Sequence, residues 1–336
     1  MVLTKVTKES GIPLIGHLAF GIVVRGSSNL IQVRPTTICN LNCPFCSTDG
    51  GPHSATHINH YIVDPSYLLE GIREILALKE SVHVNIDSVG EPTTYPYLTE
   101  FIAGLGEMEG ISMVSMQTNG TLLTKEKISE LEEAGLKRIN LSIHAMSEEM
   151  AKMLAGAQNY DINQIKRIAR AINDSGIELL IAPVYLPGVN EKEIEEIIKF
   201  AKELNCKIAI QKYEEYKYSR KMKQARKQNF YKFYAQLKKW GKEFRIRLVY
   251  NAESLEVRRA RAVKCEIKEG ERANVRVVAE GWMRNQKIAA YKNRCITISN
   301  CHASVNDRVN VKITGVRNNI CLAEMPESPF QSQKNL

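Results

Sequence analysis

The sequence predicts an α/β protein that is followed by a small all-β domain. Three observations support this prediction. Six short, apolar strand-like segments alternate with helical segments between residues 31 and 211, this alternation stops near 250–264, and residues 265–325 then show only short β-like segments. Strands that alternate with helices indicate parallel βα repeats, whereas many short strands in one stretch indicate a small closed barrel.

The chain opens with a hairpin signal and then enters the repeat. Residues 17–36 hold two β-prone stretches around Arg25-Gly26-Ser27-Ser28-Asn29, a polar turn. The strand-like segments that follow are short, rich in apolar residues and bounded by turn residues. They are IQVRPT (31–36), VHVNID (82–87), SMVSMQT (112–118), RINLSI (138–143), ELLIAPV (178–184) and KIAIQ (207–211).

Helix start signals lie between these segments. Helices are expected to begin after Asp64, Thr124, Asp161 and Asn190. Glu193, three residues after Asn190, is typical of a capping box. A partial barrel, a full barrel and a doubly wound sheet fit this alternation equally well, and in each of them ligands gather at the carboxyl ends of the strands.

Composition indicates a chain that works in a reducing compartment. No apolar run in the 336 residues reaches the about 18–20 residues of a membrane span, and the first residues do not have the pattern of a signal peptide. We therefore expect a cytoplasmic protein without a membrane partner, in which thiols stay reduced. Its eight cysteines then point to metal binding or catalysis before disulfides.

The net charge of +9 is concentrated in one segment. Residues 212–264 hold 17 Lys and Arg against 5 Glu, which gives +12 and leaves about −3 for the rest of the chain. The same segment holds ten of the 23 aromatic residues. Basic residues interleaved with aromatic ones suit phosphates and stacked bases. An amphipathic helix, with its cations in water and its aromatic residues in the core, explains the pattern equally well.

A cluster of three cysteines, Cys39-Asn-Leu-Asn-Cys43-Pro-Phe-Cys46, carries the main chemical signal. A structural zinc site usually has four ligands in two pairs, and the next cysteine is as far away as Cys206. A zinc site completed by His53, His57 or His60 stays an alternative. Three thiolates can also hold three irons of a [4Fe–4S] cluster and leave the fourth iron open.

These features together resemble the radical S-adenosylmethionine superfamily over residues 31–215. The motif CNLNCPFC follows the first strand of the repeat, Gly90-Glu91-Pro92 the second and Thr118-Asn119-Gly120 the third, while 140–144 (NLSIH) covers the fourth. Val89 stands where many relatives have another glycine. The resemblance implies a partial (β/α)6 TIM-like barrel.

The resemblance also implies cofactors and roles for particular residues. Cys39, Cys43 and Cys46 would ligate a [4Fe–4S] cluster, whose open iron would bind S-adenosylmethionine. One electron from a low-potential donor would then cleave S-adenosylmethionine to methionine and a 5′-deoxyadenosyl radical. Expected cofactor contacts are Phe45 at the adenine, Gly90, Glu91 and Pro92 at the ammonium, Ser142 at the carboxylate, and Thr118 and Asn119 at the ribose. No catalytic residue that acts on the substrate is identified.

Residues 263–325 resemble the TRAM domain, a small OB-like β-barrel attached to several RNA-modifying enzymes. The features that carry this resemblance are Glu269-Gly270-Glu271, Gly281 and residues 306–309 (NDRV). Basic residues expected on an RNA-facing side are Arg272, Arg276, Arg284, Lys287 and Lys292. Cys265, Cys295, Cys301 and Cys321 are read as small buried hydrophobic residues, with an auxiliary cluster as the alternative.

The expected organisation has five parts. These are an N-terminal extension with a hairpin (1–30), the radical S-adenosylmethionine core (31–215), a basic aromatic helical segment (216–262), a TRAM-like barrel (263–325) and a frayed tail (326–336). Residues 47–63 are expected to form a long polar loop over the mouth of the core. The arrangement resembles an archaeal-type group of the superfamily.

The favoured hypothesis is an enzyme that modifies RNA, in the first place tRNA, which it binds through residues 212–325. One alternative is radical modification of a peptide or of a small metabolite. The other is a non-enzymatic redox sensor that uses its iron–sulfur cluster. The sequence does not address the oligomeric state.

Overall fold

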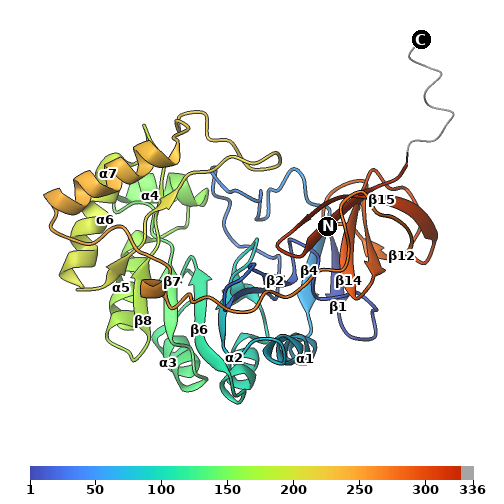
Figure 1. The fold of residues 1–336 in the computed structure, drawn as a ribbon. Helices are drawn as coiled ribbons and strands as arrows, with labels where there is room; N and C mark the ends of the chain where they lie inside the picture. The colour runs from blue at the N-terminus through green and yellow to red at the C-terminus, as the bar shows by residue number, and fades with distance from the viewer. Residues whose placement is uncertain (327–336) are drawn as a thin grey trace, which may run out of the picture.

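A seven-stranded sheet forms the centre of the molecule in the computed structural model, which describes residues 1–326 (Figure 1). The predicted frayed tail lies outside the described residues except for its first one. All neighbouring strands are parallel except β2, which pairs antiparallel with β3 as the hairpin signal predicts. In sheet order, the strands are β10 (Lys207–Ile208), β8 (Glu178–Ile181), β7 (Arg138–Leu141), β6 (Ile111–Thr118), β5 (Val82–Ile86), β3 (Leu30–Arg34) and β2 (Gly21–Val24).

The strand order decides between the fold alternatives. Each of the six parallel strands lies next to its predecessor in the chain, so every crossover winds in the same direction and the helices collect on one face. A doubly wound sheet instead reverses its strand order and carries helices on both faces. The two edge strands, β2 and β10, do not pair with each other. The predicted partial (β/α)6 barrel is therefore confirmed.

Six helices alternate with these strands, and the four that follow Asp64, Thr124, Asp161 and Asn190 begin where the predicted start signals stand. The six are α1 (Pro65–Leu76), α2 (Leu98–Gly106), α3 (Lys125–Glu133), α4 (Glu148–Ala155), α5 (Ile162–Asn173) and α6 (Glu191–Glu203). The side chains of Asp64, Thr124 and Asp161 accept hydrogen bonds from backbone N–H groups in the first turns of α1, α3 and α5.

The predicted capping box at α6 is wrong, although the helix does begin after Asn190. The Asn190 side chain makes no capping hydrogen bond and donates instead to the carbonyl oxygens of His144 and Val184. The Glu193 carboxylate accepts from the backbone N–H groups of Met146 and Ser147. Both side chains are thus used to attach α6 to the segment that follows β7.

The two faces of the central sheet differ in chemistry. The outer face is apolar and fully buried under the helices, and it includes Ile31, Val33, Val84, Ile86, Met116, Ile139, Leu141 and Ile181. The inner face carries polar side chains instead, among them Gln32, Asn85, Gln117 and Asn140, all of them half-buried. Closed TIM barrels fill this space with branched apolar residues. The open barrel keeps its inner face available for a ligand.

Short strands extend the fold beside the sheet. β1 (Val2–Val6) pairs in parallel with β4 (Asn59–Val63), and β9 (Val184–Tyr185) pairs with β11 (Gln211–Lys212). The expected loop over residues 47–63 is therefore shorter than predicted, because its last five residues form β4.

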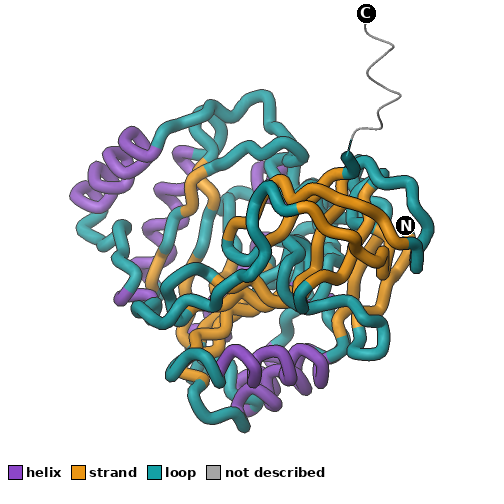
Figure 2. The backbone as a smooth tube through the Cα atoms, turned by 45° about the vertical axis from the view of Figure 1, so that its right-hand side comes forward, coloured by secondary structure: helices purple, strands orange, loops and turns teal. Residues whose placement is uncertain are grey.

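The C-terminal domain is a closed barrel of five strands, as predicted. The strands are β12 (Arg272–Glu280), β13 (Gln286–Tyr291), β14 (Arg294–Ser299), β15 (Arg308–Arg317) and β16 (Ile320–Glu324). The barrel packs against the N-terminal part of the core, beside the sheet (Figure 2). The Cys295 N–H donates to the Ile15 carbonyl at 2.7 Å, and Trp282 stacks on His57 with ring centroids 3.9 Å apart.

The segment between the two domains is helical only in part, in α7 (Phe230–Glu243) and the short η2 (Glu253–Leu255). After α7 the chain crosses the amino ends of the sheet strands. Arg138, the first residue of β7, donates to the Leu255 carbonyl at 3.3 Å, and Asn29, just before β3, donates to the Glu256 carbonyl at 3.3 Å. The chain between α7 and the small barrel, called the linker below, therefore closes the inner face of the sheet at the amino ends of its strands, which are its lower end.

Within residues 1–326, none of the helices combines the length and the apolar character that a membrane span requires.

Gly16 tests how the small barrel is docked. Its φ is +128°, and a Cβ atom there would lie 2.0 Å from the Cys295 carbonyl oxygen. Gly16→Ala is therefore expected to lower the free energy of unfolding by about 2 kcal/mol or more. Anaerobic denaturant titration measures the loss. Gly315→Ala is the control, since nothing lies within 4 Å of a Cβ at Gly315. Equal stability of the two variants would contradict this docking.

Candidate active site

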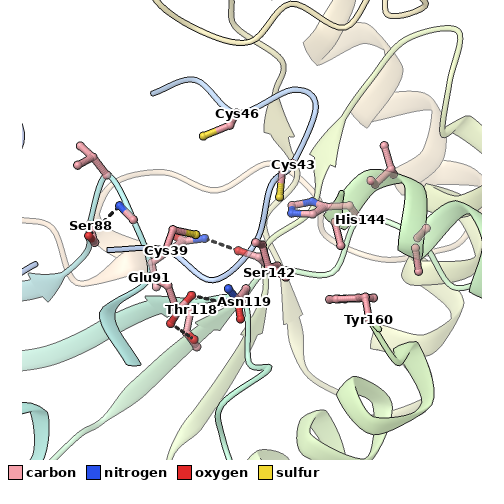
Figure 3. Close-up of a pocket in the computed structure, with 18 residues that line it drawn as sticks. Cys39, Cys43, Cys46, Ser88, Glu91, Thr118, Asn119, Ser142, His144 and Tyr160 are labelled. Carbon is pink, nitrogen blue, oxygen red and sulfur yellow. Dashed lines mark hydrogen bonds between the residues drawn. The ribbon is translucent and has the colours of Figure 1, made fainter. Parts of the chain in front are cut away.

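One cavity at the carboxyl ends of β3, β5, β6 and β7 gathers most of the predicted site residues (Figure 3). Its lining includes Cys39, Cys43, Cys46, Gly90, Glu91, Thr118, Asn119 and Ser142. Two predicted residues lie outside this lining. Phe45 lines a neighbouring pocket that shares Cys43, Cys46, Ser142 and His144 with the first. Pro92 is buried at the start of the short helix η1 (Pro92–Thr94).

The three thiols are chemically suited to an iron–sulfur ligand set. All three are free and line the same cavity. Burial, with a smaller contribution from the neighbouring thiols, raises the pKa of Cys39 to about 11 and that of Cys43 to about 12. Thiols with such high pKa values stay protonated when no partner is bound. A strongly cationic partner favours the thiolates and therefore suits this site. The residues present therefore fit a cluster.

The zinc alternative finds no support in the geometry. Among residues 1–326, no three His, Cys, Asp or Glu side chains stand close enough to hold one metal ion. The three candidate histidines also do not line the cysteine cavity. His57 stacks on Trp282, His53 contacts the Asn42 amide and His60 contacts the Thr37 hydroxyl. A cluster differs from a single-ion site because each thiolate binds its own iron.

Glu91 joins two loops of the site through a buried carboxylate. One oxygen accepts from the Thr118 hydroxyl at 2.6 Å and from the Thr93 N–H at 3.0 Å, and the other accepts from the Asn119 N–H at 2.8 Å. Burial raises the pKa of Glu91, and these donors act in the opposite direction. Both oxygens are thus already bound by protein groups. The predicted contact of Glu91 with the ammonium stays a prediction.

Gly90 is required by the close approach of two backbones. A Cβ atom there would lie 2.2 Å from the Ile38 carbonyl oxygen and 2.6 Å from that of Thr37. The next residue, Glu91, donates its N–H to the same Ile38 carbonyl at 2.7 Å. This contact places the Gly90 backbone beside the segment that leads into Cys39. Val89, the departure from the motif, is accommodated because its side chain is buried in the core.

The remaining predicted contacts also hold the site together. The Asn119 side chain donates to the Asn40 side-chain oxygen at 3.0 Å, which ties the loop after β6 to the cysteine loop. The Ser142 hydroxyl accepts from the Gln117 side chain at 2.9 Å. Their expected contacts with the cofactor stay predictions.

The structure adds an ion pair that the sequence did not reveal. Arg220 donates from Nε to Asp49 at 2.7 Å and from Nη1 to the Cys43 carbonyl at 3.1 Å, and its N–H donates to the Cys46 carbonyl at 2.9 Å. The two side chains are 15% and 5% exposed. Arg220 was one of 17 cations in the basic segment, and nothing in the sequence set it apart. It holds the cysteine loop from the outside.

His144 is a further member of the site to which the sequence assigned no role. It is half-buried and lines both pockets, its Nδ1 accepts from the Val184 N–H at 3.0 Å, and its ring meets Phe45 edge-on at 5.0 Å. Burial lowers the pKa of His144 to about 4, so the ring is neutral at pH 7. It therefore orients Phe45 without adding charge.

The fold and the site define an enzyme that holds an iron–sulfur cluster at the mouth of a partial barrel. The sequence profile of the radical SAM superfamily matches residues 33–201. An uncharacterised protein of Methanocaldococcus jannaschii is 38% identical over 96% of this chain and 82% of its own length. The chain therefore belongs to the radical SAM superfamily, whose members bind a [4Fe–4S] cluster and S-adenosylmethionine.

More distant relatives share the core. The GTP 3′,8-cyclase of Aquifex aeolicus is 27% identical over 55% of this chain and 56% of its own length. A probable GTP 3′,8-cyclase of Saccharolobus islandicus is 34% identical over 51% of each chain. The crystal structure of SuiB from Streptococcus suis superimposes with a TM-score of 0.52 at 19% identity, over 66% of this chain and 48% of SuiB. This chain thus spans about half the length of these proteins.

Cys43→Ala tests the ligand assignment. Loss of one of three thiolates is expected to abolish cluster retention and all cleavage of S-adenosylmethionine. Iron and sulfide content after anaerobic reconstitution measures it. The matched control is Cys206→Ala, a half-buried thiol that lines neither site pocket. About four irons per chain in Cys43→Ala would refute the assignment.

Arg220→Gln tests the ion pair behind the cysteine loop. Removing a cation beside the cluster is expected to make reduction harder, so the midpoint potential falls, and to speed iron loss to a chelator. Redox titration followed by electron paramagnetic resonance measures the potential. Arg220→Lys keeps the charge, so its midpoint potential should lie near the wild-type value. Its iron loss should still be faster, because Lys cannot replace all the hydrogen bonds of Arg220. Arg226→Gln, an exposed cation of the same segment, is the control. A wild-type potential in Arg220→Gln would contradict the role.

Proposed function

We propose that this radical SAM enzyme modifies RNA, in the first place tRNA. When bound, the cluster and S-adenosylmethionine supply a 5′-deoxyadenosyl radical that abstracts a hydrogen atom from the substrate. The observation that carries the proposal is the position of the basic segment. Lys212 and Tyr216 line the pocket next to the cysteine cavity, and Arg220 contacts the cysteine loop itself. RNA bound along this segment would therefore lie at the site.

The exposed side chains of the segment support RNA as the partner. The buried face of α7 carries Phe233, Leu237 and Trp240, so the helix is amphipathic. Other aromatic rings nevertheless face solvent, among them Tyr231 at 83%, Tyr216 at 59% and Phe230 at 58% exposure. Exposed lysines stand near these rings in the chain, at 217, 221, 223 and 232. Cations for phosphates beside free rings for stacking are what single-stranded nucleic acid requires.

The residues around the two pockets would have separate tasks. Cys39, Cys43 and Cys46 would hold the cluster, and Glu91 would keep the loops around it in place. Phe45 and His144 would form the end that takes the adenine ring, since together they close the second pocket. The reaction also needs a low-potential electron donor. The eight free thiols suit the cytoplasm as the compartment.

The small barrel offers a weaker basis for RNA binding than the sequence predicted. Lys287 pairs with Glu280, and Lys292 pairs with Glu271 at 2.7 Å. Arg276 donates to the Asn306 side chain at 2.7 Å, and Arg272 is exposed. Cys295, Cys301 and Cys321 are buried in the apolar interior, as small hydrophobic residues would be. The likeness to a TRAM domain stays a prediction.

Radical modification of a nucleotide metabolite is the second candidate. The two relatives named as GTP 3′,8-cyclases match about half of this chain. Incubation of the reconstituted enzyme with bulk tRNA, followed by mass spectrometry of the nucleosides, tests the proposal. A mass change in one nucleoside is expected. Unmodified tRNA beside turnover of free GTP would favour the metabolite.

The lysines of the segment give a quantitative test of RNA binding. Replacing Lys217, Lys221 and Lys223 by alanine together is expected to weaken tRNA binding and to reduce the slope of log K against log salt by about two. Filter binding between about 50 and 200 mM KCl measures the slope. The matched control replaces Lys192, Lys199 and Lys202 of α6. Equal slopes in the two triple variants would rule the segment out as the RNA contact.

A further inference from the structure

A row of side chains with amide groups lies on the inner face of the sheet, directly below the cysteine cavity. Strand register places Gln117 of β6 beside Asn140 of β7, and Asn85 of β5 beside Ser115 of β6. Register partners on neighbouring parallel strands point to the same face. Gln117 also lines the cysteine cavity, so the row continues downward from the cofactor site. The helices lie on the other face of the sheet (Figure 1).

The row is held in place by its own hydrogen bonds and still has free polar atoms. The side-chain oxygen of Asn85 accepts from the Ser115 hydroxyl at 2.8 Å and from the Asn140 amide at 3.4 Å. The Gln117 amide donates to Ser142 at 2.9 Å. In the part of the chain that the structure describes, Asn85 Nδ2, Asn140 Oδ1 and Gln117 Oε1 have no protein partner. One donor and two acceptors thus remain for a ligand.

The charged side chains around the row are already paired with one another, two carboxylates with three cations, which restricts what the row can bind. Asp87 pairs with Arg34 at 2.8 Å. Glu178 pairs with Arg138 at 2.6 Å and with Lys207 at 2.6 Å. A charged ligand would have to leave water without an unpaired counter-ion here, which is costly. A neutral ligand with both donors and acceptors fits instead. Because the linker at Leu255 closes the lower end, such a ligand would enter from the cofactor cavity.

We propose that Asn85, Gln117 and Asn140 bind the target base of a nucleotide substrate. This inference rests on the proposed function and names the group that enters the barrel. The edge of a base carries donors and acceptors side by side, and the free Asn85 donor together with the free Asn140 and Gln117 acceptors offers the complementary groups. Enzymes that act on a base take it out of the stack. The phosphates stay outside on the basic segment, and the base lies below the cofactor.

Asn140→Ala and Gln117→Ala test the proposal. The quantity to measure is the ratio of 5′-deoxyadenosine formed with bulk tRNA to that formed without it, in enzyme that holds about four irons per chain. Each variant is expected to lower this ratio about fivefold or more, because it removes one acceptor to which the base edge would donate. Asn163→Ala, an exposed amide on the first turn of α5, should keep the wild-type ratio. Asn140→Ser replaces Asn140→Ala if the latter does not retain iron.

The outcomes separate this inference from the proposed function. A lowered ratio with unchanged tRNA affinity supports the base site, since the affinity comes from the outer segment. Wild-type ratios in both variants overturn the base site and leave RNA modification standing. If tRNA does not stimulate the wild-type enzyme, the proposal of RNA modification is contradicted. Equilibrium dialysis with the four ribonucleosides and GTP then tests the base site by itself. Binding that Asn140→Ala abolishes supports the site for free nucleotides, and absence of binding overturns it.

Discussion

The buried carboxylate of Glu91 is the interaction on which the site depends. Its N–H holds the Ile38 carbonyl just before Cys39, while its side chain accepts from Thr118 and Asn119 at the end of β6. Glu91, in the loop after β5, therefore ties together the carboxyl ends of β3, β5 and β6. A carboxylate that leaves water is stable only when donors replace its hydration, and several do so here. The absence of a Cβ at Gly90 allows the approach that puts these donors in reach.

The sequential strand order explains why this edge can hold both a cofactor and a substrate. Crossovers of one hand put the helices on the outer face, which is apolar and buried. The inner face is left to polar residues, closed below by the linker and open above at the cysteine cavity. The basic segment then returns over the same edge, where Arg220 and Asp49 fasten it to the cysteine loop. The proposed cluster site, cofactor pocket and substrate surface thus share neighbouring contacts.

Local patterns in the sequence predicted the local features well. The six strands, four helix starts and five barrel strands follow from alternation, caps and turn residues, and the cysteine spacing singled out three thiols that one cavity brings together. Long-range pairings were not predictable. Nothing near Arg220 indicates its partner 171 residues away, and Asn190 and Glu193 have the spacing of a cap but bond to another loop. The polar inner face required the strand register, which the sequence does not state.

The most direct test of the central claim is the anaerobic formation of 5′-deoxyadenosine. The protein would be reconstituted with iron and sulfide, reduced with dithionite and given S-adenosylmethionine, with and without small RNA. Cleavage that RNA stimulates is the result that the account predicts. Cleavage without stimulation by RNA would contradict the RNA substrate and favour a peptide or metabolite. Absence of 5′-deoxyadenosine under every condition, in protein that holds its iron, would contradict the role given to the three cysteines.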